Sequence, residues 1–367
     1  MEYKLEEFIT YEQPAKYIVE SDQYNDSYDI PVLTAGQTFI LGYTNEQDNI
    51  FDNLPVIIFD DFTTSVQYVD FPFKVKSSAM KLLKNTSKSN LKYCYYMLKY
   101  FQKQPENHKR QWISSTSQIK IDLPNIDNQS KIVEKLDFVQ EIIAKYKRQL
   151  NMLDELVKAR FVEMFGDPLI NEKGWKIRKL KNISNKIGSG ATPKGGKEVY
   201  IHNGISLIRS MNVYNNRFEY KELAHITDEQ AKKLSNVKVE KNDILLNITG
   251  ASVARCYIVP IDILPARVNQ HVCIIRCKEI IHPIFLHGVI TNKEYQNHLL
   301  KLAGTGATRE AINKQQIESL DVIFPPIELQ NQFADFVKEV DKSRLEVQKS
   351  LKKTQELFDS LMQKYFG

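Results

Sequence analysis

The chain has 367 residues, 42% of them hydrophobic and 26% charged, which is an ordinary composition for a soluble protein. This length exceeds one ordinary hydrophobic core and predicts two domains with additional elements. The net charge of +5 is too small to indicate a nucleic-acid partner by itself. No apolar run approaches the roughly 18 residues that a membrane-spanning helix needs.

The N-terminal segment is acidic and mixed in character, unlike a signal peptide. The cysteines show no C-x-x-C spacing and have no histidines at metal-ligand spacing; they are Cys94, Cys256, Cys273 and Cys277. We therefore expect no metal site, no membrane association and a reducing, cytoplasmic setting.

The charges are unevenly distributed along the chain. Residues 1–70 contain 14 acidic residues against Lys4 and Lys16, whereas residues 71–121 contain 11 Lys or Arg against Glu106. Residues 168–321 contain 23 basic and 14 acidic residues. Two basic regions favour separate surfaces for an anionic partner, although a solvated face produces the same pattern.

Residues 1–122 predict a first α+β unit made of many short strands. Apolar residues surround a glycine-marked turn in residues 29–45, and a short buried strand is expected within residues 53–61. Residues 89–103 predict an aromatic-rich helix, whose apolar spacing is more typical of a core face than of a base-stacking surface.

Residues 123–166 predict a long helix that follows Pro124 and has no internal Gly or Pro. Apolar residues recur at alternating steps of four and three, which is the a/d spacing of a coiled coil over about four heptads. This predicted seam comprises Ile132, Leu136, Val139, Ile143, Tyr146, Leu150, Leu153 and Val157.

Residues 167–323 predict a second globular unit that repeats the plan of the first more loosely. Its segments 203–216, 241–259 and 268–278 match the segments 29–40, 53–69 and 75–85 of the first unit. Residues 283–302 predict a helix pair in the place of the aromatic-rich helix. The segment 185–201 is the most basic and glycine-rich loop in the chain.

Residues 324–367 predict a second long helix, which repeats the first at a constant offset of 201 positions. Pro124 falls on Pro325, Gln129 on Gln330, and Phe165-Gly166 on Phe366-Gly367. The second seam, interrupted at Arg344 and Thr354, comprises Phe333, Val337, Val340, Val347, Leu351, Phe358 and Leu361. The other long helix is the natural partner for each seam.

The sequence argues against catalysis by this chain. No Asn/Asp-Pro-Pro-aromatic loop of an amino-methyltransferase is present, and the Gly-rich loop 188–197 fails the phosphate-loop pattern, because Ala191 occupies the position of its first glycine. The seven histidines form no pattern of nucleophile and base. We therefore expect no catalytic residue and no bound cofactor.

Glycines and cations in loops favour a DNA-binding function instead. Glycine lets backbone approach a ligand closely, Lys supplies charge for phosphates, and Arg, Asn and Gln read base edges. Candidate contacts in the second unit are Lys186, Ser189, Gly190, Thr192, Lys194, Lys197, Arg209, Asn212, Arg255, Asn269, Gln270, Thr305, Thr308 and Arg309. Those in the first unit are Tyr43, Thr44, Thr63, Thr64, Lys74, Lys76, Lys109, Arg110 and Ser114.

Several short motifs resemble those of the specificity subunit of type I restriction–modification systems. Each long helix begins with a Leu/Phe-Pro-x-Ile/Leu-x-x-Gln signature, LPNIDNQ at 123–129 and FPPIELQ at 324–330. A Phe-Gly ends each helix, and SGATP (189–193) and LNITGASVAR (246–255) extend the resemblance. The first unit departs from the pattern, with YEQPAKYIV and FDDFTTS in the places of the last two motifs.

The resemblance covers the whole chain and implies an α+β fold with two target recognition domains, 1–122 and 167–323. The helices 123–166 and 324–367 would form an antiparallel coiled coil with a pseudo-twofold repeat. Each domain would read one half of a split double-stranded DNA site, and the coiled coil would set the spacer. Two methyltransferase subunits, which bring S-adenosylmethionine, would dock on this chain, as would restriction (motor) subunits through the complex.

Two alternatives remain open at this point. One is a specificity subunit of a related system in which cleavage is fused to methylation. The other is a coiled-coil scaffold that binds protein partners without reading DNA.

Overall fold

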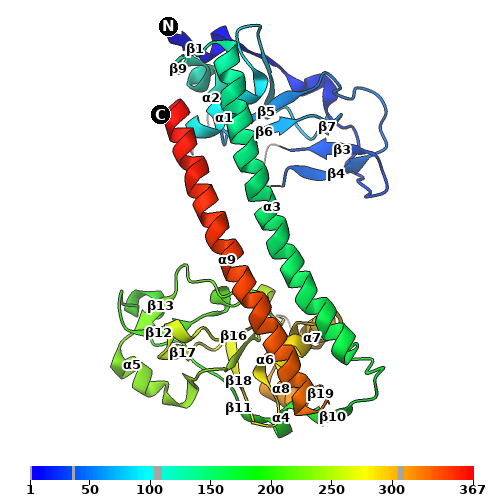
Figure 1. The fold of residues 1–367 in the computed structure, drawn as a ribbon, viewed down its shortest axis with the longest axis vertical. Coiled ribbons are helices and arrows are strands. Elements are labelled where there is room, and N and C mark those ends of the chain that lie inside the picture. Colours follow the sequence, from blue (N-terminus) through cyan, green and yellow to red (C-terminus); the bar gives the residue numbers. More distant parts are fainter. Residues whose placement is uncertain (1, 35–37, 103–109, 305–309) are drawn as a thin grey trace. The chain divides into compact units, whose positions relative to one another are not determined.

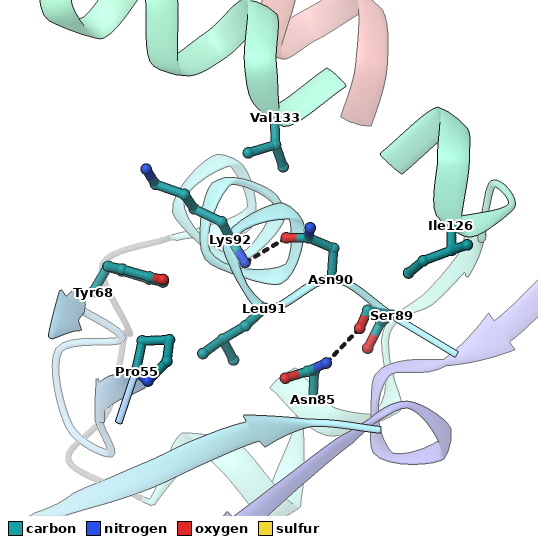
Figure 2. A pocket seen from close by; sticks show the side chains of 9 residues that line it. All are labelled: Pro55, Tyr68, Asn85, Ser89, Asn90, Leu91, Lys92, Ile126 and Val133. Atoms are coloured by element: carbon teal, nitrogen blue, oxygen red, sulfur yellow. Dashed lines mark hydrogen bonds between the residues drawn. The ribbon is translucent and has the colours of Figure 1, made fainter. Parts of the chain in front are cut away.

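The computed structural model describes residues 2–34, 38–102, 110–304 and 310–367 (Figure 1). The chain divides into two compact units. Unit 1 contains residues 1–147 and 349–367, and unit 2 contains residues 148–348. Among the described residues, no helix is both long enough and apolar enough to cross a membrane.

Unit 1 contains two main sheets, one four-stranded and one three-stranded. The first sheet has the antiparallel order β2-β8-β5-β6, and its strands are Ile9–Glu12, Met80–Asn85, Val56–Asp60 and Val66–Val69. The second has the order β4-β3-β7, with β3 and β7 parallel, and its strands are Ile40–Thr44, Ile30–Leu33 and Lys74–Val75. Helices α1 and α2 span Leu91–Phe101 and Gln111–Ser114, and β1 (Glu2–Lys4) pairs with β9 (Lys120–Asp122).

Unit 2 repeats this topology with one additional strand, β14, in its second sheet. Its four-stranded sheet has the order β11-β18-β15-β16, with strands Ser184–Ser189, Val272–Cys277, Ile244–Asn247 and Cys256–Ile258. The other sheet has the order β13-β12-β17-β14, with β12 and β17 parallel, and its strands are Ala224–Ile226, Ile205–Ile208, Ala266–Val268 and Lys238–Val239. Strands β10 (Lys176–Lys179) and β19 (Asp321–Phe324) form the counterpart of the β1–β9 pair. The three segment matches predicted from the sequence are therefore confirmed.

The short helices of unit 2 are α4, α5, α6, α7 and α8, which span Leu180–Ile183, Asp228–Lys233, Pro283–Thr291, Lys293–Gly304 and Lys314–Glu318. The expected helix pair is thus α6 followed by α7. Its counterpart in unit 1, α1, buries Leu91 and Leu98 in the core, as the predicted core face requires.

The two long helices, α3 (Ile126–Phe165) and α9 (Ile327–Phe366), are each 40 residues long and begin and end at positions 201 apart. Unit 1 contains the first part of α3 and the last part of α9, where Leu136 and Ile143 share a core with Phe358. Unit 2 contains the opposite ends, where Phe161 contacts Phe333 at 5.5 Å between ring centroids. The two helices therefore run antiparallel.

All the predicted seam residues are buried or half-buried. Apolar residues on other faces of the helices are exposed, including Phe138, Met152, Leu156, Leu345 and Leu357. The interruption at Arg344 has a physical reason: its guanidinium forms an ion pair with Asp154 of the other helix at 2.5 Å. A cation on the seam is accommodated because α3 supplies a carboxylate opposite it.

Candidate nucleic-acid interface

Polar loops of unit 2 converge at one end of the sheet β11-β18-β15-β16. Ser189, the last residue of β11, pairs with Cys273 near the start of β18, and Asn247 at the end of β15 pairs with Val272. Because neighbouring strands are antiparallel, the segments 189–193, 248–255 and 269–271 all lie at this end of the sheet. Candidate contacts from three separate parts of the sequence are thereby brought together.

Gly190 allows two of these loops to approach closely. Its backbone N–H donates to the carbonyl of Asn269 at 3.1 Å. A Cβ atom at this position would lie 1.7 Å from the carbonyl oxygen of Val268, so a side chain is excluded unless the backbone moves.

A row of hydrogen-bonded polar side chains lies across the same end of the sheet. The hydroxyl of Thr192 donates to Oε1 of Gln270, and Nε2 of Gln270 lies 3.0 Å from Nε2 of His271. An amide nitrogen only donates, so this ring nitrogen accepts and the other, Nδ1, donates to the Thr249 hydroxyl at 2.5 Å. Both ends of the Gln270 amide are therefore fixed, although the residue itself is exposed.

The cations of unit 2 occupy three different environments. Lys194 and Lys197 are exposed on the loop that follows β11. Lys186 is half-buried and donates to the carbonyl of Asn236, and burial lowers the pKa of its amine. Arg255 lies over the Tyr214 ring at 4.6 Å, so its guanidinium is oriented by a cation–π contact.

The structure corrects five predicted side-chain contacts, because the side chains of Thr44, Thr64, Lys74, Asn212 and Asn269 are buried. Lys74 is 2% exposed and forms an ion pair with Glu46 at 2.6 Å. Asn212 accepts from the backbone of Arg209, and Asn269 accepts from the backbone of His271. In this structure these polar side chains are buried within their own domain rather than exposed to a ligand.

The candidates of unit 1 form two separate groups. Arg110 and Thr63 are exposed on segments that are held together, because the backbone N–H of Trp112 donates to the Asp61 carboxylate at 3.0 Å. Ser114, also exposed, donates to the Arg110 carbonyl. The other group, Tyr43 and Lys76, belongs to the three-stranded sheet, where Lys76 forms an ion pair with Asp22.

Four candidates, Lys109, Thr305, Thr308 and Arg309, lie outside the described residues.

Sequence reasoning missed three residues that shape these edges. Thr249 and His271 orient the Gln270 amide, and Asp61 holds the segment that begins at Arg110 in unit 1. Asp61 is itself buried against Lys81 at 3.2 Å. The only sequence signal for His271 was its position next to Asn269-Gln270, and an Asp in a loop carries no signal of burial.

The described residues include no cluster of His, Cys, Asp or Glu side chains that could hold a metal ion. The cysteines are free, and burial raises the pKa of the Cys94, Cys273 and Cys277 thiols to about 12. These thiols are therefore protonated and unreactive at neutral pH.

Comparisons with known proteins agree with this geometry. The family model for the type I restriction modification DNA specificity domain matches residues 1–154 and 172–357. The EcoR124I/EcoR124II specificity subunit of Escherichia coli is 33% identical over 92% of this chain and 85% of its own length. The EcoBI specificity subunit of Escherichia coli is 25% identical over 66% of this chain and 57% of its own length.

Two solved structures share the fold. The S subunit of a type I restriction-modification system from M. genitalium has a TM-score of 0.62 at 14% identity, covering 100% of this chain and 96% of that one. A chain from a study of type I complex assembly and conformational transition has a TM-score of 0.55 at 13% identity, covering 100% of this chain and 97% of that one.

The repeated topology and the matched DNA specificity domain define a DNA-recognition protein built from two similar domains. The matched family is more specific: the chain belongs to the type I restriction–modification specificity subunits. Membership of this family makes it a non-catalytic DNA-recognition subunit.

Proposed function

We propose that this specificity subunit reads a bipartite DNA sequence, with each unit reading one half. The observation that carries the proposal is the repetition of one strand topology with different loop residues. Unit 2 has hydrogen-bonded polar side chains there, namely Thr192, Gln270, His271 and Thr249. Unit 1 instead has Thr63 and Arg110, on segments that are joined through Asp61. Two similar domains with different polar edges suit two different half-sites.

Within unit 2, the Gln270 amide is the best-placed group for reading a base edge. Gln pairs with adenine through one donor and one acceptor, so its amide must not rotate. Hydrogen bonds from Thr192 and to His271 hold the amide in one orientation. This arrangement reduces the entropy lost on binding DNA.

The long helices would set the spacer between the half-sites. Each helix continues through both units, and 40 residues at about 1.5 Å each give roughly 60 Å of helix. Contacts one turn apart on B-DNA are separated by about 34 Å, which is within that length.

Methyltransferase subunits would dock on this chain and supply S-adenosylmethionine, and restriction subunits would join through the complex. The exposed faces of the helices support such docking, because Phe138 and Met152 of α3 are each 64% exposed. Large exposed apolar side chains commonly mark protein interfaces. A DNA partner and buried, protonated cysteines suit a cytoplasmic setting.

A domain exchange tests the proposal. Residues 1–122 would be replaced by the equivalent domain of another specificity subunit, and methylated bases would be mapped after coexpression with the methyltransferase. We expect one half-site to change while the other half-site and the spacer remain. A change in both halves would contradict modular reading, and no DNA binding by the complex would favour a protein scaffold. Neighbouring genes would distinguish a type I system from one with fused cleavage and methylation.

A further inference from the structure

A cavity of about 310 Å³ lies in unit 2 beside the end of β12, and we propose that it binds a phosphodiester group of the DNA backbone. The inference rests on the proposed DNA-reading function and assigns a role that differs from base recognition. The residues that would form the site are Lys197, Tyr200, His202, Arg209, Glu222 and Leu223.

Arg209 is the central group of this cavity. One of its terminal nitrogens, Nη2, donates to the backbone carbonyl of Glu222, and the guanidinium lies 5.6 Å from the centre of the Tyr200 ring. Glu222 has a backbone φ of 57°, a left-handed conformation, at the residue whose carbonyl faces the arginine. The side chain is therefore held by contacts on two sides before any ligand binds.

The remaining donors of Arg209 favour an anion within the cavity. Its Nε is buried, and no acceptor for it is present among the described residues. A buried donor without a partner is costly, and because this nitrogen is not accessible to solvent, the Arg209 side chain must shift for a ligand oxygen to reach it and recover that free energy. Phosphate oxygens accept from guanidinium groups in the paired geometry that such a fork offers.

The environment also distinguishes a phosphate from a base edge. Arg209 is half-buried within the domain, whereas a side chain that reads guanine must extend into the major groove. The exposed amine of Lys197 is a second cation at the rim, against the single carboxylate of Glu222. The surplus positive charge matches one phosphodiester, and Tyr200 and Leu223 would contact the adjoining sugar.

Among the described residues of unit 1, no equivalent site is present. Strand β3 pairs in parallel with β7, as β12 does with β17. When these two strand pairs are aligned, Leu33 is the equivalent of Ile208, and Thr34 is the equivalent of Arg209. The segment before β3 contains only acidic charges, at Glu20, Asp22, Asp26 and Asp29. This contact with the DNA backbone is therefore a property of unit 2, and the two domains anchor DNA unequally.

The test is salt-dependent binding of the full chain, in complex with its methyltransferase, to a duplex that carries the mapped site. Arg209→Gln is compared with Lys233→Gln, which removes an exposed cation of the same unit that does not line the cavity. We expect Arg209→Gln to weaken binding several-fold and to reduce the slope of log K against log salt by about 0.9, as for one lost phosphate contact. The Lys233→Gln slope should equal that of the unchanged protein.

Two further measurements keep the result interpretable. Lys197→Gln changes only an exposed side chain and should lower affinity in the same direction, which separates binding from any folding defect of Arg209→Gln. Duplexes with one neutral methylphosphonate are then scanned, and at one position the unchanged protein should lose as much affinity as Arg209→Gln does. The methylated sequence should stay the same in each variant.

A change in one base pair of the methylated sequence would instead make Arg209 a base reader and overturn the proposal. Unchanged affinity and salt slope in both cavity variants would also overturn it, while recognition of DNA by the chain would stand. Failure of the unchanged complex to bind any duplex would contradict the DNA-reading function itself.

Discussion

The side-chain oxygen of Gln129 accepts a hydrogen bond from the backbone N–H of Asn90 at 2.8 Å. This contact links the first turn of α3 to the residue that caps α1. In unit 2, Gln330 accepts from the N–H of His282 at 2.8 Å, and His282 caps α6 in the same way. Each glutamine is fully buried and also donates to a proline carbonyl, of Pro124 or Pro325. The Gln of each helix-start motif therefore attaches a long helix to its domain.

Replacing Gln330 with Leu should destabilise unit 2 by about 1–3 kcal/mol, because two buried backbone groups lose their hydrogen-bond partner. Denaturant unfolding of the full chain would measure the loss. Gln332→Leu is the matched control, since Gln332 is exposed two residues further on. Equal effects of the two substitutions would show that the buried hydrogen bonds contribute nothing.

Replacing Gly190 with Ala should impair recognition of the half-site read by unit 2 only. The new Cβ would overlap the Val268 carbonyl and displace the loop that carries Thr192. Gly188→Ala is the control, because nothing lies within 4 Å of its added Cβ. Methylation kinetics on duplexes with one altered half-site would report the effect. An equal loss in both glycine variants would argue against the loop contact.

Removing one heptad from each long helix, residues 143–149 and 345–351, should shorten the recognised spacer. Seven residues correspond to about 10 Å of helix, or roughly three base pairs of B-DNA. Both helices must be shortened together, because they run antiparallel and a single deletion would misalign their seams. Mapping methylated bases would measure the spacer. Full activity with an unchanged spacer would rule out the helices as its determinant.

Acid should destabilise the protein partly through His287. Burial between α6 and β16 lowers the pKa of its ring to about 4, and Nε2 lies 3.2 Å from the carbonyl of Cys256. The unfolded chain would bind a proton between about pH 6.5 and pH 4 where the folded chain does not. The contribution of the uncharged His287 ring to the free energy of unfolding is thus fully present above about pH 6.5. It decreases as the pH is lowered, by at most about 1.4 kcal/mol per pH unit.

Denaturant unfolding from pH 7 to pH 4 would test this contribution. His287→Gln retains a donor for the Cys256 carbonyl and removes the titrating ring, so its stability should depend less on pH over that range. His225→Gln is the control, since His225 lies on β13, outside this packing. An unchanged slope for His287→Gln would exclude His287 as a source of the acid sensitivity.

The sequence alone determined the helical framework and the repeat. Seam periodicity and the offset of 201 predicted two equal helices, because a pattern of apolar residues at helical spacing depends on local geometry. The matching segments of unit 2 followed from its likeness to unit 1, and the motif at each helix start indicated the family.

Only the tertiary structure decided which polar residues are free to meet DNA. Lys74 and Asn212 have the side chains of DNA-binding residues, yet they are buried on Glu46 and on the backbone of Glu219. Arg209 lines a cavity, and the seam position of Arg344 is explained by Asp154, 190 residues away in sequence. Burial and pairing of a polar side chain depend on contacts between distant segments, which a local pattern does not contain.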